Sequence, residues 1–155
     1  MAVTANALHL VGLALKAGRL EIGEEPVGAA CRAKRAKVVL LASDAAENTA
    51  RRAERFALAG KAPCVALPFT KAELGHSIGR ASCAMLALTD AGLAASLMDK
   101  LKALDPARYA ETAQTLNEAA ERTQRRQKER RAHERKIRQG GRKPWAAPPP
   151  EKKQT

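Results

Sequence analysis

Short apolar runs alternate with stretches that carry helix signals from the N-terminus to about Leu104. Residues 38–42 are apolar at every position, which is typical of a strand covered on both faces of a sheet. Helices that connect the strands of one sheet have to cover both of its faces. Because only 3% of the residues are aromatic, we expect a core of Ala, Leu, Val and Ile. The alternation predicts an α/β fold, an α/β/α sandwich of three layers.

Turn, cap and stop residues mark the predicted elements. Thr4 and Gly18 have the positions of a cap and a stop for the first helix, and residues 70–73 have the capping-box pattern. Residues 23–26 combine a glycine, two acids and a proline, which indicates another helix start. The predicted strands are 20–22, 38–42, 64–67 and 83–88. The predicted helices are 4–18, 23–34, 48–60, one that begins after Thr70, and 91–102.

The composition changes at Asp105-Pro106, a dipeptide that favours the end of one helix and the start of another. Residues 1–104 hold 14 basic and 9 acidic residues, whereas residues 105–155 hold 14 and 7. We therefore expect an α/β/α domain at 1–104, a basic, helical extension at 105–139, and a disordered Gly/Pro-rich tail at 140–155. Large apolar residues are few in the extension, so it is either an exposed helix or a coil that orders on a partner.

The formal net charge of +12 makes a polyanion the leading expectation for a partner. Nucleic acid is the first candidate, and an anionic membrane surface is the second. No apolar run approaches the roughly 18 residues of a membrane-spanning helix, and the N-terminus lacks the basic lead-in of a signal peptide. We therefore expect a cytoplasmic protein that binds nucleic acid and no membrane.

Basic residues gather in three places that are candidates for phosphate contacts. Residues 122–138 hold nine basic residues and two glutamates, and arginine predominates there. Guanidinium groups bind phosphate in a bidentate way and stack on unpaired bases, which favours RNA over a membrane. The alternatives are that helix ends and solvated faces attract cations, and that the last cluster only aids solubility. The candidate RNA-binding residues are Arg32, Lys34, Arg35 and Lys37, then Arg51 and Arg52, then Arg125, Arg126, Arg130 and Arg131.

No arrangement of residues predicts catalysis, a cofactor or a metal site. Cys31, Cys64 and Cys83 are widely spaced among small or apolar residues, which predicts buried thiols rather than a disulfide framework or a metal clip. The histidines lack the spacing of metal ligands. Ser43 and Asp44 are adjacent, but no spacing places a base beside them, so turn and helix-start residues are the preferred interpretation. We expect a protein that is not an enzyme.

A set of segments, in a fixed order along the chain, points to a known family. The segments are LALKAGRL at 13–20, GEE at 23–25, KRAKVVLLASDA at 34–45, NT at 48–49, TKAELG at 70–75, IG at 78–79 and LTD at 88–90. Together they resemble the L7Ae/L30e ribosomal protein family, and within it the bacterial YlxQ-like branch, over about residues 5 to 100. The resemblance implies a three-layer α/β/α sandwich around a four-stranded mixed sheet. It also implies binding of structured RNA, including kink-turns, which are sharply bent helices with tandem sheared G·A pairs.

In that family the RNA face is built around the turn into the second helix, the loop after the second strand and the loop before the last strand. Carried over by position, the resemblance implicates Gly23, Glu24 and Glu25, then Ser43 and Asp44, then Ala81, Ser82 and Cys83. A glycine lets N–H groups at a helix start approach phosphate, and small loop residues can pack on an extruded base. The chain departs from the kink-turn pattern at three positions, where it has Glu25, Pro26 and Ala29 instead of Asn, Glu and Lys.

We therefore expect a non-catalytic RNA-binding protein that is associated with the ribosome or another structured RNA, as a ribonucleoprotein component acting in translation. The alternative is a protein-interaction adaptor of the translation or transcription machinery. In that case ribosomal or transcription-elongation proteins are the partners, and the basic extension contacts RNA without specificity. The three departures at Glu25, Pro26 and Ala29 favour the adaptor.

Overall fold

The computed structural model describes residues 2–140, and side-chain burial for residues 4–139. The described residues divide into two units, of which the first ends at Ala120 and the second begins at Glu121. The helices are α1 (Ala2–Lys16), α2 (Glu24–Arg32), α3 (Glu47–Gly60), α4 (Lys71–Ser77), α5 (Ala91–Leu104) and α6 (Pro106–Gly140). The strands are β1 (Leu20–Ile22), β2 (Val38–Leu41), β3 (Cys64–Ala66) and β4 (Met85–Leu88).

The four strands form one mixed sheet in the order β1-β4-β2-β3. Strand β4 pairs antiparallel with both β1 and β2, and β2 pairs parallel with β3. Leu88 lies opposite both Leu20 and Val38, so the last residue of β4 meets the first residues of β1 and β2. The mixed four-stranded sheet expected from the resemblance is confirmed.

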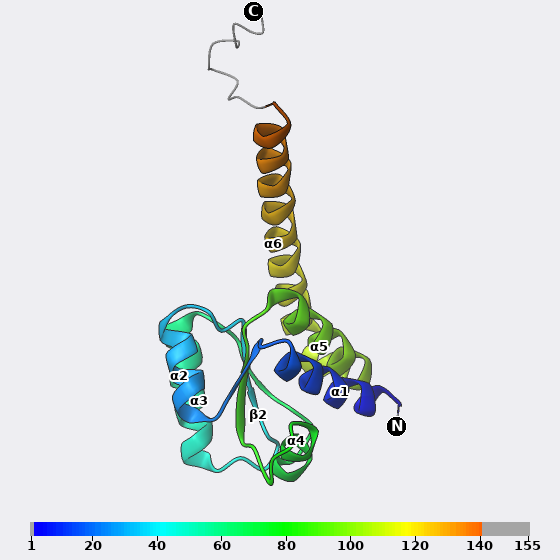
Figure 1. Ribbon diagram of the computed structural model, residues 1–155. Helices are drawn as coiled ribbons and strands as arrows, with labels where there is room; N and C mark the ends of the chain where they lie inside the picture. The colour runs from blue at the N-terminus through cyan, green and yellow to red at the C-terminus, as the bar shows by residue number, and fades with distance from the viewer. Residues whose placement is uncertain (1, 141–155) are drawn as a thin grey trace, which may run out of the picture. The chain divides into compact units, whose positions relative to one another are not determined.

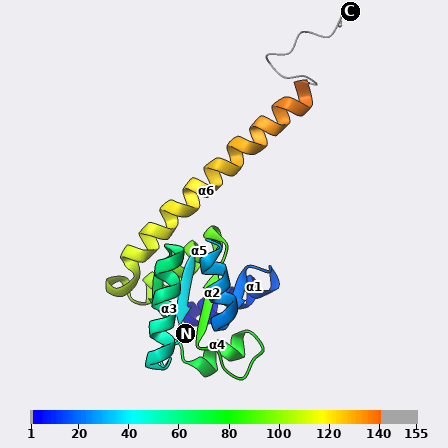
Figure 2. The ribbon, with the colours of Figure 1, turned by 90° about the vertical axis from the view of Figure 1, so that its left-hand side faces the viewer.

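Both faces of the sheet are buried under helices, in three layers (Figure 1). In β2, the side chains of Val38 and Leu40 belong to one core cluster, and those of Val39 and Leu41 belong to the other. Because side chains alternate along a strand, an all-apolar strand supplies both cores. Helices α1, α4 and α5 cover one face, and α2 and α3 cover the other, which faces the viewer in Figure 2. The predicted α/β/α sandwich is confirmed.

Most element boundaries agree with the sequence analysis to within a few residues. Strand β1 has the predicted bounds, and the Thr70 side chain forms the predicted capping box with Glu73. Thr4 is not a cap, because α1 already begins at Ala2. The last strand begins at Met85 rather than at Cys83, because the Cys83 N–H donates to the carbonyl of Lys71 instead of joining the sheet.

The first four turns of α6 belong to the core of the first unit. Tyr109, Ala113, Leu116 and Ala120 recur at helical spacing and are all buried. The Tyr109 hydroxyl donates to the carbonyl of Ala66 on β3 over 2.7 Å. The expectation of an exposed helix or coil is therefore wrong for this stretch. The large residues Tyr109 and Leu116 alone do not predict a buried face, but Ala113 and Ala120 complete it as an apolar stripe.

The second unit, described by itself, is helical as far as Gly140. Every side chain from 124 to 139 is exposed, and the candidate RNA-binding residues Arg125, Arg126, Arg130 and Arg131 are among them. The predicted helix is confirmed here. The predicted disordered tail at 140–155 lies outside the described residues from 141 onward, and the division at 104 and 139 stays a prediction.

Candidate nucleic-acid interface

The three segments implicated by the resemblance lie at one end of the sheet, the lower end in Figure 1. Ile22 at the end of β1 pairs with Leu86, and Leu41 at the end of β2 pairs with Met85 at the start of β4. The antiparallel register therefore brings the turn after β1, the loop after β2 and the loop before β4 together. We call this region the α2-start end of the sheet.

A pocket of about 240 Å³ opens at this end between the turn into α2 and the loop before β4. Of the predicted residues, Gly23, Glu24, Ser82 and Cys83 line it, together with Ile22, Thr49, Arg80, Ala84 and Met85. Ala81 is exposed beside the pocket and does not line it. The structure thus joins two of the three predicted segments around one cavity.

Backbone geometry fixes the turn into α2. Gly23 has a φ of 93° and a ψ of 167°, a conformation that is essentially restricted to glycine. Its N–H donates to the carbonyl of Met85 over 3.0 Å, which ties the helix start to the first residue of β4. No side chain caps the helix at Gly23, so the first N–H groups of α2 keep no intrahelical or side-chain partner.

The opposite wall of the pocket is held by helix α4. A Cβ atom built on Gly75 would lie 2.6 Å from both the N and the Cα of Ser82 and 2.9 Å from the carbonyl carbon of Ala81. The helix therefore touches the loop backbone at a point where only glycine fits. The carbonyl of Gly75 also accepts the N–H of Arg80 over 2.7 Å, which fixes the start of the same loop.

The carboxylate of Glu24 is paired. Its Oε1 lies 2.6 Å from Nη1 of Arg52, which ties the first turn of α2 to α3. Arg51 pairs with Glu47 within α3 at 2.9 Å. Both predicted arginines on α3 are thus engaged with carboxylates, whereas Glu25 is exposed at the start of α2.

Ser43 and Asp44 follow β2 but do not line the pocket. The Oδ1 of Asp44 accepts the N–H of Lys71 over 2.7 Å, and the N–H of Ser43 donates to the carbonyl of Phe69 over 2.7 Å. These contacts fix the segment that leads into α4, which agrees with their interpretation as turn residues. Contact of either residue with RNA stays a prediction.

Arg80 and Thr49 are pocket residues that the sequence analysis missed. Arg80 directly precedes the implicated loop at 81–83 and is exposed, so it is the nearest cation to the loop residues along the chain. Its place next to that loop was the signal that could have identified it. Thr49 belongs to the family pattern, but nothing in its spacing marks it as a lining residue.

The cluster of Arg32, Lys34, Arg35 and Lys37 does not reach this pocket. It lies where α2 ends and β2 begins, at the other end of the sheet, because α2 runs from one end to the other. Helix α2 ends at Arg32 rather than near Lys34, since Lys34 has a φ of 62° and leaves the helix. We call this region the α2-finish end of the sheet.

The two ends differ in charge. At the α2-start end, carboxylates at least balance cations, with Glu24, Glu25, Asp44, Glu47 and Glu73 beside Arg51, Arg52, Lys71 and Arg80. At the α2-finish end, cations predominate, with Lys16, Arg19, Arg32, Lys34, Arg35, Lys37 and Lys61 beside Glu21 and Asp90. The pocket is therefore suited to recognising shape and hydrogen-bonding groups rather than to collecting phosphate charge.

The cysteines have the character of packing residues. Cys31 and Cys83 are buried, Cys64 is half-buried, and all three are free thiols. Burial raises the pKa of each thiol, and for Cys64 burial and the nearby carboxylate of Glu54 raise the pKa to about 11. Within residues 2–140 no three His, Cys, Asp or Glu side chains come together as a metal-binding group.

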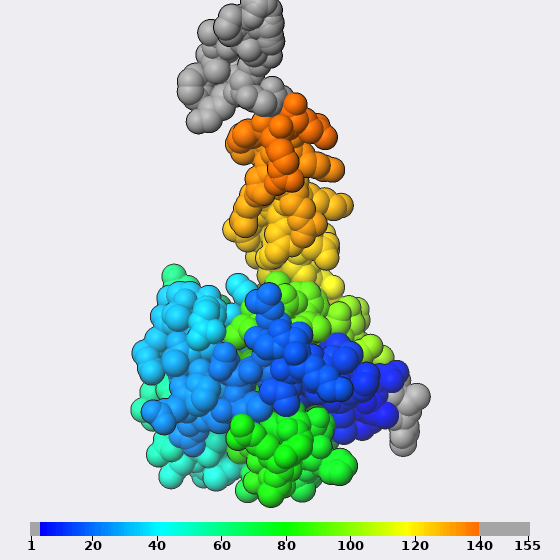
Figure 3. Space-filling view, in the orientation of Figure 1, coloured from blue at the N-terminus to red at the C-terminus, as the bar shows by residue number. Residues whose placement is uncertain are grey.

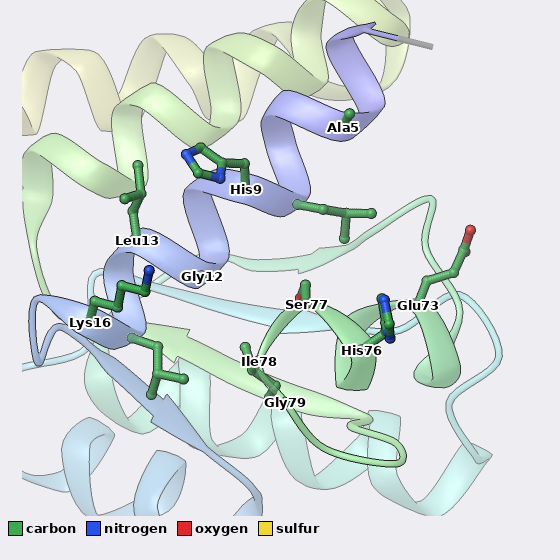
Figure 4. Close-up of a pocket in the computed structure, with 12 residues that line it drawn as sticks. Ala5, His9, Gly12, Leu13, Lys16, Glu73, His76, Ser77, Ile78 and Gly79 are labelled. Carbon is green, nitrogen blue, oxygen red and sulfur yellow. The ribbon is translucent and has the colours of Figure 1, made fainter.

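A second, larger hollow of about 610 Å³ lies between α1 and α4 (Figure 4), two helices whose surfaces lie next to each other in Figure 3. Leu13 and Leu15 from α1 line it, with 43% and 37% of their surfaces exposed. Figure 4 shows the α1 side chains, such as His9 and Lys16, along one side and those of α4, such as His76, along the other. None of the residues predicted to bind RNA lines this hollow.

A family model described as the ribosomal protein L7Ae/L30e/S12e/Gadd45 family matches residues 5–98. The chain belongs to this family. The matched residues run from α1 through most of α5 and include every residue that lines the pocket. The resemblance drawn from the sequence is therefore confirmed.

Two curated relatives are each described as the RNA-binding protein YlxQ. The chain is 40% identical to the protein of Enterococcus faecium over 75 residues, which cover 48% of this chain and 72% of that protein. It is 38% identical to the protein of Bacillus subtilis (strain 168) over 96 residues, which cover 59% of this chain and 91% of that protein. These relatives support the YlxQ-like branch named from the sequence.

Two solved structures are similar in fold. A protein of unknown function from Bacillus halodurans superposes with a TM-score of 0.57 and 28% identity, covering 62% of this chain and 96% of that one. The Giardia lamblia 15.5 kD RNA binding protein gives a TM-score of 0.52 at 18% identity, covering 67% and 91%. The second likeness shows the fold alone.

The family membership agrees with the expectation that the chain is not an enzyme. Within residues 2–140, none of the helices combines the length and the apolar character that crossing a bilayer requires.

Proposed function

We propose that this protein binds structured RNA, and that the pocket at the α2-start end recognises it. The observation that carries the proposal is the convergence of Gly23, Glu24, Ser82 and Cys83 around one cavity, as the family resemblance implied. Support comes also from the curated relatives, both of which are described as RNA-binding proteins.

Three features in and beside the pocket suit an unpaired nucleotide. The N–H groups of Glu24 and Glu25 at the start of α2 have no side-chain cap, so a phosphate or a base oxygen can accept hydrogen bonds from them. Ser82 and Ala81 are small and exposed, so an extruded base can approach the loop backbone closely. Arg80 supplies a guanidinium at the same rim for stacking or for a phosphate.

We propose further that the RNA belongs to the ribosome or another ribonucleoprotein and that its bend resembles a kink-turn. The exposed positions Glu25, Pro26 and Ala29 alter the edge that would read the base pairs. Ala29 in particular leaves the second turn of α2 without a cation toward phosphate. We therefore expect recognition by the pocket and the loop to dominate over contacts from this face of α2.

The experiment compares a labelled kink-turn hairpin with a hairpin in which the tandem G·A pairs are replaced by G·C pairs. The full chain should bind the kink-turn hairpin more tightly, and Arg80→Gln should reduce that difference. Lys102→Gln on α5 serves as the matched control, because Lys102 is exposed and lines none of the hollows described above. Failure of the chain to bind any RNA at low salt would overturn the proposal.

The second candidate function is the protein-interaction adaptor of the translation or transcription machinery. The exposed leucines Leu13 and Leu15 beside the hollow between α1 and α4 favour it, since exposed apolar side chains in a groove suit an apolar peptide segment. A variant that ends after Ala120 keeps every buried residue of the first unit. If this variant loses all RNA binding but still co-purifies with a ribosomal or elongation protein, the adaptor is the better account.

A further inference from the structure

The α2-finish end of the sheet carries a cationic hollow of its own, built from two similar turns. Gly18 after α1 and Lys34 after α2 both adopt positive φ, 72° and 62°. The N–H of Arg19 donates to the carbonyl of Ala14 over 2.8 Å, and the N–H of Arg35 donates to the carbonyl of Ala30 over 2.9 Å. Both closures are Schellman turns, which place Arg19 and Arg35 at equivalent positions.

The two turns lie side by side because the sheet joins the strands that follow them. The N–H of Lys37 donates to the carbonyl of Leu88 over 2.7 Å, and the N–H of Thr89 donates to the carbonyl of Arg19 over 3.0 Å. Between them lies a hollow of about 280 Å³, which we call the twin-turn hollow. Its lining residues are Gly18, Arg19, Lys34, Arg35, Lys37 and Thr89. The lining contains four cations and no carboxylate or large apolar side chain.

Structural roles account for only part of this charge. The Lys34 Nζ donates to the carbonyl of Ala59 at the end of α3, and Arg35 lies 3.5 Å from the carboxylate of Glu21. Among the described residues, no hydrogen bond or ion pair engages the side chain of Arg19 or Lys37. The Schellman turns already satisfy the last carbonyls of both helices with backbone N–H groups, so these two side chains are not needed as caps.

We infer that the twin-turn hollow binds the phosphate backbone of a second segment of the same RNA, an inference that rests on the proposed function. Two unpaired cations at one concave site, on a backbone that hydrogen bonds hold in place, match what phosphate contacts require. The pocket at the α2-start end is not rich in cations, so affinity for the polyanion has to come from elsewhere on the protein. Arg19 and Lys37 supply part of it, in addition to the exposed arginines of the second unit, at a site that the family pattern of RNA-binding segments leaves out.

The two sites contact different parts of the RNA because the sheet separates them. Strand β4 and its flanking residues lead from Cys83 at the pocket to Thr89 at the hollow, and a strand advances about 3.3 Å per residue, so the sites lie roughly 20 Å apart. An anionic membrane is the less suitable partner, because interfacial binding needs apolar side chains that the lining lacks.

The test uses the full chain, a labelled RNA hairpin with a long stem, and salt from about 50 to 300 mM. The variant Arg19→Gln/Lys37→Gln removes the two unpaired cations and leaves Lys34 and Arg35 in their contacts. Its matched control is Lys100→Gln/Lys102→Gln on α5, which makes the same change in net charge. Lys100 is half-buried like Lys37, and Lys102 is exposed like Arg19. Circular dichroism melting of all the proteins verifies that they are folded.

The test variant should lower the slope of log affinity against log salt by about 1.4 to 1.8, which corresponds to a loss of roughly 25- to 60-fold in affinity at 0.1 M salt. The control should keep the wild-type slope. Equal slopes for the test variant and the wild type overturn the inference and leave the proposed function intact, and so do equal losses in both variants. Loss of binding to phosphatidylserine vesicles with an unchanged RNA slope overturns it in favour of a membrane. Absence of RNA binding by the wild type overturns the proposed function and this inference together.

Discussion

The substitution Gly75→Ala tests whether helix α4 positions the loop that lines the pocket. The added Cβ would lie 2.6 Å from the Ser82 backbone, and ordinary contact begins at 3.4 Å, so the helix and the loop would have to separate by about 0.8 Å. The obstructing atoms belong to the backbone, so no side-chain rotation can make room. We therefore expect the loop itself to move.

The magnitude follows from two opposing effects on the folded state. Overpacking of this kind costs about 1 to 3 kcal/mol, and the better helix propensity of alanine returns about 1 kcal/mol. The net loss of up to about 2 kcal/mol should lower the melting temperature by no more than roughly 8 °C. The loop contacts to RNA are worth about 1 to 3 kcal/mol, so their displacement should weaken binding of the kink-turn hairpin roughly 5- to 150-fold. The salt dependence should not change, because no cation is removed.

Fluorescence anisotropy with the kink-turn hairpin and thermal unfolding measure the two effects on the same preparations. Gly92→Ala on α5 is the matched control, since its Cβ would meet only the side-chain oxygen of Asp90, at 3.2 Å. If Gly75→Ala melts at the wild-type temperature and binds the hairpin with wild-type affinity, then the close approach of α4 does not determine the shape of the pocket.

Three further predictions concern α2, α6 and the thiols. Ala29→Lys should raise the affinity for the kink-turn hairpin about sixfold at 0.1 M salt, because it adds one phosphate contact with a slope near 0.8; equal affinities for Ala29→Lys and Ala29→Gln would contradict this. Tyr109→Phe removes the hydrogen bond to Ala66 and should lower the free energy of unfolding in urea by about 1 kcal/mol, whereas an unchanged midpoint would show that the bond adds nothing. Cys64, with its pKa raised to about 11, should be about one part in a thousand thiolate at pH 8 and react with iodoacetamide far more slowly than an unfolded cysteine, with the rate rising up to pH 11. The unfolded thiol ionises near 9.0, so the contribution of Cys64 to stability should be constant below that pH and fall between pH 9 and 11; mass spectrometry of the labelled peptide and urea titrations at several pH values measure both effects.

The fold was largely predictable because local patterns determine it. Residues 38–42 are apolar throughout, and the structure buries all of them, with both faces of β2 in contact with helices. The order of the strands was not predictable from periodicity, because pairing between β4 and β1 joins residues that are far apart in the chain. Tyr109 and Leu116 were recognised as apolar, but the surrounding charge hid that they form a buried stripe.

The candidate site was predictable only in part. The resemblance placed Gly23 and Ser82 in one site, and they do line one pocket. Gly75 was missed, because its importance comes from a close approach between two backbones that no sequence pattern reveals. The sequence predicts a cluster of cations around Lys37 at the end of the second helix, but only the strand order shows that this cluster and Gly23 lie at opposite ends of one sheet. Which residues share a surface depended on topology rather than on residue type.

The contact between Tyr109 and Ala66 also limits how this domain can recruit partners. Strand β3 is an edge strand, and such edges are open to β-augmentation, in which a peptide from another molecule adds itself as a further strand. Here the tyrosine hydroxyl occupies a carbonyl that an added strand would need, and a buried helix is anchored beside it. Addition of a peptide strand at this edge is therefore discouraged, and so is association of copies through it.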